Sequence, residues 1–216
     1  MVAPSAIADR LRADILELRF VQGEALREIP LAEEFGASRR SVRDALMMLA
    51  HEGLVTHERN RGARVRRFSA SDVHDLYVAR AVLEAEGARR CADAPDASLD
   101  AVQVALLELR RAAELGQDTP RHAKADVAFH AAVIALAGSA RLDDFFSRIR
   151  GEMTYAIRLL QREEVVHGQR DTEVLGDHED IAAAILDRDP LGAESAVLEH
   201  VRVNEGLLAV IAAARD

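Results

Sequence analysis

Several residue types and patterns are scarce in this sequence. Of its 216 residues only Cys91 is a cysteine, which excludes a disulfide framework within the chain and is typical of a reducing compartment. The apolar runs are short, so we expect no membrane-spanning segment and no membrane partner. The first ten residues lack the charged-then-apolar pattern of a secretion signal. These absences predict a cytoplasmic protein, long enough for one large domain or two small ones.

Lysine is almost absent, so arginine supplies the positive charge. Lys124 is the only lysine among 28 basic residues, and the formal net charge is −9. The charge is uneven, because residues 1–67 hold 12 arginines against 10 acidic residues, whereas residues 68–216 hold 16 basic residues against 27 acidic ones. This distribution predicts a basic head that contacts a polyanion and a larger acidic body, although chance clustering on a solvated surface would give the same counts.

The first third of the chain has the pattern of three helices and a hairpin. Apolar residues recur at helical spacing over 5–20, a short helix is expected over 26–35, and Ser38 is a suitable N-cap for a third helix. Two strand-like runs, 54–57 and 63–67, then flank a turn. Three helices followed by a two-stranded hairpin predict a winged helix-turn-helix.

From residue 69 onward the pattern is helical throughout. We expect helices near 71–94, 98–116, 119–137, 140–162, 172–187 and 190–214. The connections between them are short, which implies an antiparallel bundle. The sequence therefore predicts a mainly α protein of two domains. We expect residues 1–68 to form a winged helix-turn-helix domain and residues 69–216 to form an all-helical domain.

The third predicted helix begins with a cluster of arginines. The first turn of a recognition helix enters the major groove, and its free backbone N–H groups also favour phosphate. Arginine in that turn can pair with guanine edges or with the DNA backbone. The alternative is an ordinary solvated helix start. The residues predicted to contact DNA are Ser38, Arg39, Arg40, Ser41 and Arg43 on this helix, and Arg61 and Gly62 at the hairpin tip.

Three of the eight histidines and one aspartate have the spacing of a metal site. Asp126 and His130 are four residues apart and so share one helix face. His178 and His200 each lie 11 residues from Asp189, in the turn between the last two helices. Both are therefore about 16 Å from that turn. Three imidazoles and a carboxylate suit Zn²⁺, with Ni²⁺ or Mn²⁺ as alternatives. The competing interpretation is that each histidine is hydrogen-bonded separately.

The head resembles a known family. The DNA-binding domain of GntR-type transcriptional regulators is similar to the run Gly36-Ala37-Ser38-Arg39, followed by Val42-Arg43-Asp44-Ala45-Leu46, Gly53-Leu54-Val55, Arg61-Gly62 and Val65. The resemblance implies that Arg39 and Arg43 contact DNA, that Arg40 and Ser41 tune sequence choice, and that Gly62 lets the hairpin approach closely. Many members have Thr-Pro where this chain has Arg40-Ser41, so the resemblance does not give the operator sequence.

The helical body resembles the FCD ligand-binding domain of the FadR subfamily of these regulators. The similarity begins near Asp72 and includes Asp126-x-x-Phe129-His130, His178-x-x-Ile181, Ala193 and His200. In metal-containing members an aspartate and three histidines hold the ion, and all four positions are filled here. The resemblance implies a divalent metal whose coordination is completed by water or by a small carboxylate effector.

Two further residues are candidates for effector binding. Arg80 matches a common arginine on the first FCD helix, although it could instead form a surface pair with Glu84, four residues later. Asn204 lies one turn beyond His200 and shares its helix face.

These features together predict a transcriptional regulator. A homodimer would bind a pseudo-palindromic operator, in most cases as a repressor, and a small organic acid at the metal would modulate its affinity. One alternative is a metal-responsive regulator with no organic effector. Another is a metal-dependent hydrolase, which would need a general base beside the ligands. The sequence offers no such base, so we expect no enzyme activity and assign no catalytic residue.

Overall fold

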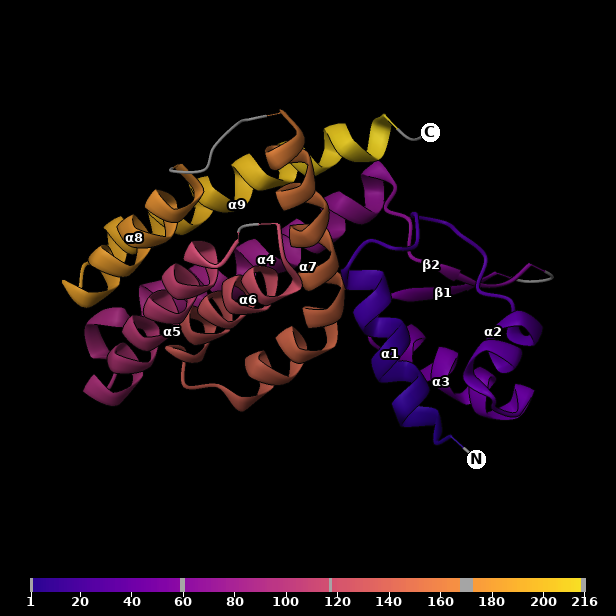
Figure 1. Ribbon diagram of the computed structural model, residues 1–216. Helices are drawn as coiled ribbons and strands as arrows, with labels where there is room; N and C mark the ends of the chain where they lie inside the picture. The colour runs from indigo at the N-terminus through magenta and orange to yellow at the C-terminus, as the bar shows by residue number, and fades with distance from the viewer. Residues whose placement is uncertain (1, 59–60, 117, 168–172, 215–216) are drawn as a thin grey trace.

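The computed structural model describes residues 2–58, 61–116, 118–167 and 173–214, which form a small head and a larger helical bundle (Figure 1). The head contains α1 (Pro4–Leu16), α2 (Glu28–Phe35), α3 (Arg39–His51), β1 (Val55–Glu58) and β2 (Gly62–Val65). The bundle contains α4 (Ala70–Arg89), the 3₁₀ turn Cys91–Asp93, α5 (Asp96–Glu114), α6 (Pro120–Ala135), α7 (Ala140–His167), α8 (Glu173–Leu186) and α9 (Pro190–Ala213). The predicted fold class is confirmed.

The apolar faces of α1 and α3 form the core of the head. Ile7 and Leu11 of α1 and Leu46 of α3 are at most 1% exposed. The strands β1 and β2 pair antiparallel, with Val55 opposite Val65. Residues 59 and 60, which the sequence assigns to the turn, lie outside the described residues. This packing fixes α3 against α1 and leaves the first turn of α3 exposed.

Some helix ends differ from the predicted ones. The first helix ends at Leu16 instead of residue 20, because Leu18 adopts a left-handed conformation with φ of 56° that cannot continue a helix. The first bundle helix ends at Arg89 instead of residue 94. Pro95 forces the preceding Ala94 into an extended conformation, with ψ of 141°. In the other direction, α7 extends past residue 162 to His167.

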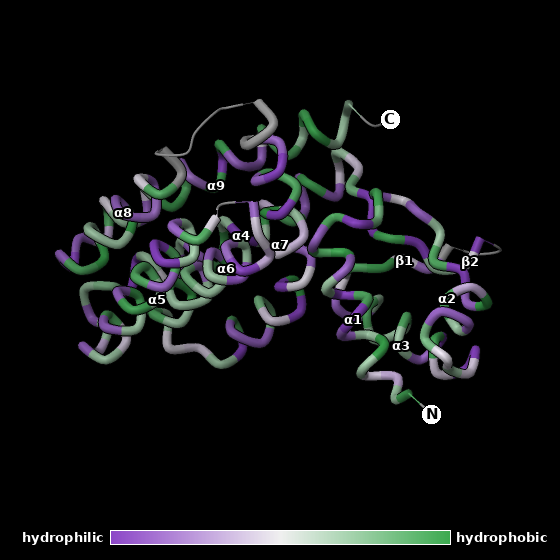
Figure 2. The backbone as a smooth tube through the Cα atoms, in the orientation of Figure 1, coloured by the Kyte–Doolittle hydropathy of each residue, from purple (hydrophilic) through white to green (hydrophobic). Residues whose placement is uncertain are grey.

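The bundle packs its helices in mutually contacting pairs. The helix α4 lies along α9 and also contacts α6, while α8 packs on both α5 and α9. Figure 2 shows hydrophobic and hydrophilic residues alternating along these helices, as expected when one face of each is buried. The arrangement brings α4, α6, α8 and α9 around a common interior. In the described part of the chain, no helix is both long and apolar enough to cross a membrane.

The long helix α7 lies against the head (Figure 1). Gly151 of α7 meets the end of α3 so closely that a Cβ atom there would overlap the carbonyl oxygen of Glu52. A Cβ on Gly53 would likewise overlap the side chain of Glu152. Arg66, which follows the hairpin, adds an ion pair to Glu152 at 3.0 Å. Head and bundle are therefore in direct backbone contact through α7.

Candidate functional site

The first turn of α3 combines a firm N-cap with exposed arginines. The hydroxyl of Ser38 accepts a hydrogen bond from the backbone N–H of Ser41 at 3.0 Å, and the two hydroxyl oxygens are 2.9 Å apart. This cap fixes where the helix begins. Arg39 and Arg40 follow it directly, and both are exposed. The turn thus presents positive charge and a helix N-terminus on the same surface.

Glu28, at the start of α2, engages the arginines of α3. Its two carboxylate oxygens accept hydrogen bonds from Nε and Nη2 of Arg43, both at 2.7 Å, and Arg39 Nη2 lies 3.5 Å away. The hydrogen bond from Arg43 is the main reason why the pKa of Glu28 lies below its usual value. Sequence reasoning missed Glu28, since the contact joins residues on two different helices. The carboxylate orients Arg43 and offsets part of its charge.

The hairpin tip is described only in part. Gly62 begins β2 opposite Glu58 and has φ of 77°, a left-handed conformation that favours glycine. Arg61 precedes it and is exposed. Both predicted residues are thus at the end of the hairpin.

Three helices bring the four predicted metal ligands together inside the bundle. One ring nitrogen from each of His130, His178 and His200 lies within 4.8 Å of the other two, and all three side chains are buried. Asp126 Oδ1 lies 3.2 Å from Nε2 of His130, and its Oδ2 lies 3.6 Å from Nε2 of His178. Asp126 and His130 come from α6, while α8 and α9 supply the other two residues. The structure therefore gathers all four predicted residues.

Burial and charge give these groups unusual pKa values. Burial acts to raise the pKa of Asp126, but its electrostatic interactions with His178 and His130 outweigh this effect, and the pKa lies well below its usual value. Burial acts to lower the pKa of His130, yet the charge of Glu84 raises it above 6.5. Burial is the main cause that lowers the pKa of His200 to about 4.

The donor set fits a divalent metal ion. Three imidazole nitrogens and a carboxylate oxygen converge in a buried space, and Asp126 Oδ1 has no hydrogen-bond partner within the described residues. Glu84 Oε2 lies 2.8 Å from Nδ1 of His130. A proton on Nδ1 would face this carboxylate, so that Nε2 would carry no proton and could bind a metal ion in the cluster. A buried carboxylate without a matched donor costs free energy, which a bound cation would offset.

Arg80 and Asn204, the predicted effector residues, both reach the cluster. Arg80 Nη2 lies 3.1 Å from Nε2 of His130, while its Nε donates to Glu84 at 2.9 Å. The pair with Glu84 is therefore real, but it is fully buried instead of lying at the surface, because α6 covers this face of α4. Asn204 Nδ2 lies 3.1 Å from Nε2 of His200. The sequence analysis did not predict that Glu84 contacts His130. The position of Glu84, four residues after Arg80, was the signal that could have placed it near the cluster.

A chain of buried hydrogen bonds connects α6 with the head. His122, one turn before Asp126, has Nδ1 3.2 Å from Nε2 of Gln161 on α7. Arg158 of α7 donates from Nη1 to the Gln161 side chain at 3.1 Å, and from Nε to the carbonyl oxygen of Leu16 at 2.8 Å. Leu16 is the last residue of α1, where helix carbonyls lack partners within the helix. The bundle therefore caps a helix of the head.

Comparison with protein families yields two matches along the chain. Residues 4–65 match the bacterial regulatory proteins of the gntR family, and residues 75–203 match the FCD domain. This chain belongs to the GntR family of bacterial transcriptional regulators. Regulators of this family bind DNA operators, so the predicted DNA partner is confirmed at the level of the family. The family also confirms that the protein is a regulator and not an enzyme.

Individual relatives extend over most of this GntR regulator. A helix-turn-helix regulator from an unstable DNA locus of Streptomyces ambofaciens is 30% identical over 195 residues, covering 89% of this chain and 79% of the relative. The gluconate operon repressor of Bacillus licheniformis is 27% identical over 184 residues, covering 85% of this chain and 75% of the relative. A crystal structure of a GntR regulator from Rhodococcus sp. RHA1 superposes with a TM-score of 0.78 at 26% identity, covering 95% of this chain and 96% of the Rhodococcus chain.

Proposed function

We propose that this GntR regulator is a dimeric repressor whose operator affinity depends on a divalent metal and a small organic acid bound inside the FCD domain. The convergence of three histidine nitrogens within 4.8 Å, beside a buried carboxylate, is the observation that supports it most. Asp126, His130, His178 and His200 would hold the ion. Zn²⁺ suits three nitrogens and one oxygen, with Ni²⁺ and Mn²⁺ as alternatives. The ion would supply a Lewis-acidic position for a carboxylate oxygen.

The effector proposal rests on the buried donors beside the cluster. Arg80 places a guanidinium 3.1 Å from His130, and Asn204 places an amide beside His200. A carboxylate that reached the metal would find both donors within the same interior. The gluconate operon named for the Bacillus licheniformis relative makes sugar acids the first carboxylates to test.

The DNA-binding proposal assigns roles to the exposed residues of the head. Arg39, Arg40 and Ser41 would enter the major groove with the first turn of α3, while Ser38 keeps that turn in place. Arg43 would leave Glu28 for phosphate or a guanine edge. Arg61 and Gly62 would bring the hairpin to the adjacent DNA backbone. Two heads of a dimer would then read two halves of a pseudo-palindrome.

The hydrogen-bond chain from α6 to α1 supports a route between the two sites. His122 shares a face of α6 with Asp126 and His130, so a shift of α6 on ligand binding would move Gln161 and Arg158 as well. An effector needs only a preference of roughly 1–3 kcal/mol for one arrangement to change operator affinity 5–150-fold.

Paired substitutions test whether the two sites are separate. Duplexes selected from a random library by the purified protein provide the DNA, and a chelator competition provides the metal affinity. Arg43→Ala should weaken DNA binding at least tenfold, roughly, and leave metal content intact, since a bidentate contact is worth about 1–3 kcal/mol. His178→Ala should lose the metal, bind DNA as tightly as the metal-free wild type does, and show no response of DNA affinity to added metal. Equal damage to both activities by both variants would contradict the proposal.

A second candidate, a regulator that senses the metal itself, is favoured by one observation. Arg80 is already held by Glu84 and lies over the ring of Tyr77, with 5.0 Å between its Cζ atom and the ring centroid. In this arrangement Arg80 has fewer N–H donors left for a carboxylate. Titration of Zn²⁺ against DNA affinity, with and without gluconate and other small acids, separates the two. If the metal changes affinity and no acid does, metal sensing replaces the acid-binding proposal.

A further inference from the structure

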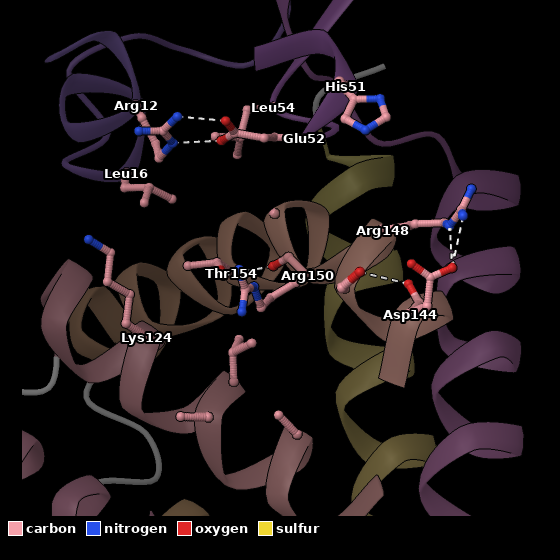
Figure 3. Close-up of a pocket in the computed structure, with 15 residues that line it drawn as sticks. Arg12, Leu16, His51, Glu52, Leu54, Lys124, Asp144, Arg148, Arg150 and Thr154 are labelled. Carbon is pink, nitrogen blue, oxygen red and sulfur yellow. Dashed lines mark hydrogen bonds and ion pairs between the residues drawn. The ribbon is translucent and has the colours of Figure 1, made fainter. Parts of the chain in front are cut away.

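A cavity lies between the head and the bundle, apart from the histidine cluster. Its volume is about 820 Å³. Arg12 and Glu52 line it from the head, and Lys124, Arg150 and Thr154 line it from α6 and α7 (Figure 3). The size matches pockets that bind small organic molecules.

The charges around this cavity do not cancel. Glu52 is engaged by Arg12 through two hydrogen bonds of 2.6 Å, and Asp144 accepts from Arg148 at 2.8 Å (Figure 3). Lys124 and Arg150 are the remaining charged residues of the lining. Across the described ranges neither has an ion-pair partner. Two cations are thus left uncompensated in a bundle that is strongly acidic overall.

The rest of the lining is mainly apolar. Leu16 and Leu54 contribute from the head, and Val127, Ala128 and Ala131 contribute from α6. We propose that this cavity binds a small organic anion. Its carboxylate, sulfonate or phosphate group would lie between Lys124 and Arg150, and its apolar body would lie on these aliphatic side chains.

The proposed anion site is independent of the metal centre. Lys124 is about 200° around α6 from Asp126, at ~100° per residue, so the two side chains leave opposite faces of the helix. Asp126 is buried toward α8 and α9, whereas Lys124 is exposed toward the head. The inference therefore goes beyond the proposed function, and either can fail without the other.

An anion in this cavity would contact both domains at once. Leu16 ends α1, and Thr154 lies one turn before Arg158, which caps α1 from the bundle. A ligand that touches both sides stabilises the arrangement of head and bundle that it fits, by an amount set by its concentration and affinity. The site is thus suited to control the orientation of the DNA-binding head.

The first experiment measures binding of 8-anilinonaphthalene-1-sulfonate, a sulfonate with an apolar body, by fluorescence titration at 0.15 M salt, roughly physiological. The wild-type protein should bind one equivalent per chain. Lys124→Gln and Arg150→Gln should each weaken binding about tenfold, the worth of one charge-assisted hydrogen bond. Arg141→Gln is the matched control: Arg141 is exposed at the start of α7 and does not line the cavity. It should bind like the wild type.

Hydrogen exchange then locates the bound sulfonate in the full chain. The wild type should gain protection at the end of α1 and in the middle of α7, and neither Lys124→Gln nor Arg150→Gln should do so. His178→Ala, which would lose the metal, should retain both binding and protection. Unchanged binding in the two charge variants, with unchanged thermal unfolding, would overturn the site. Protection confined to α8 and α9 would overturn it as well, and would place the sulfonate at the histidine cluster.

Discussion

At the scale of single residues, Glu28 sets how much of the charge on α3 is available to DNA. Its bidentate contact with Arg43 and its proximity to Arg39 place a carboxylate on the surface that we propose contacts DNA phosphate. An acidic residue there weakens non-specific attraction to DNA and keeps Arg43 in one rotamer. Both effects favour selectivity over affinity.

Substitution of Glu28 by Gln should therefore raise affinity for random-sequence duplex by a few-fold. Because one negative charge leaves the contact surface, the dependence of log affinity on log salt should steepen by about one unit at most. Fluorescence anisotropy at several salt concentrations measures both quantities. Glu33→Gln, on an exposed position of α2 away from Arg43, serves as the control. A loss of random-sequence affinity in Glu28→Gln would show that orientation of Arg43 matters more than its charge.

The pKa values of the histidine cluster predict that the proposed metal affinity depends on pH. A proton and a metal ion compete for Nε2 of His130, and the pKa of His130 is raised above 6.5. Zn²⁺ affinity should thus fall as pH drops through that pKa, by about tenfold per pH unit for one competing proton. His200, with its pKa lowered to about 4, stays neutral above pH 5 and adds nothing to this slope. Chelator competition between pH 8 and pH 5.5 measures it.

The exposed His51 of α3 provides the control for that titration. His51→Gln should leave the pH profile unchanged, since the residue lies outside the cluster. Zn²⁺ affinity that stayed constant between pH 8 and pH 6 would contradict the role given to His130.

At the scale of secondary-structure elements, the contact between α7 and the end of α3 depends on a glycine. Gly151→Ala should destabilise the protein by about 1–3 kcal/mol, because the added methyl group overlaps the backbone oxygen of Glu52 and the helices must separate. Urea unfolding measures the change. Gly206 of α9 is a matched control, since a Cβ there meets nothing within 4 Å. Gly206→Ala should instead stabilise by about 0.5–1 kcal/mol.

The helices could be predicted from the sequence because their signals are local. Apolar periodicity, the cap at Ser38 and the proline after Asp189 locate α3 and the last helical hairpin. Equal distances from the turn at Asp189 also place His178 beside His200, whose ring centroids are 4.6 Å apart. The predicted ends of the helices were less accurate than their predicted positions along the chain. The left-handed Leu18 has no signal in a pattern of apolar residues.

Features that join distant elements could not be predicted in this way. Whether Arg80 and Glu84 are surface or core residues depends on where α6 packs, and no local pattern contains that information. The contact between Glu28 and Arg43 depends on the angle between α2 and α3. The interdomain cavity depends on how α7 meets the head. In each case the missing quantity is tertiary packing.

At the scale of the whole molecule, Arg158 joins the two domains through one buried side chain. It donates to the carbonyl oxygen of Leu16 in the head and to Asp118 and Gln161 in the bundle. If this arginine transmits the state of the metal centre, Arg158→Gln should bind Zn²⁺ with unchanged affinity. Its DNA affinity should no longer respond to the metal. Paired measurements of Zn²⁺ binding and DNA binding on one preparation test this.

Arg162→Gln is the control for that experiment. Arg162 also pairs with Asp118, at 3.0 Å, but it is half-exposed. Its response to metal should equal that of the wild type. A full metal response in Arg158→Gln, together with normal thermal unfolding, would assign the coupling to another contact.

The position of Lys124 has a practical consequence. Since the chain contains no other lysine, an amine-reactive fluorophore can attach to a side chain only at this ε-amino group, and otherwise only at the α-amino group. The dye would report from the junction of the two domains. Energy transfer to a labelled duplex could then follow movements of the head during ligand exchange, without any engineered cysteine.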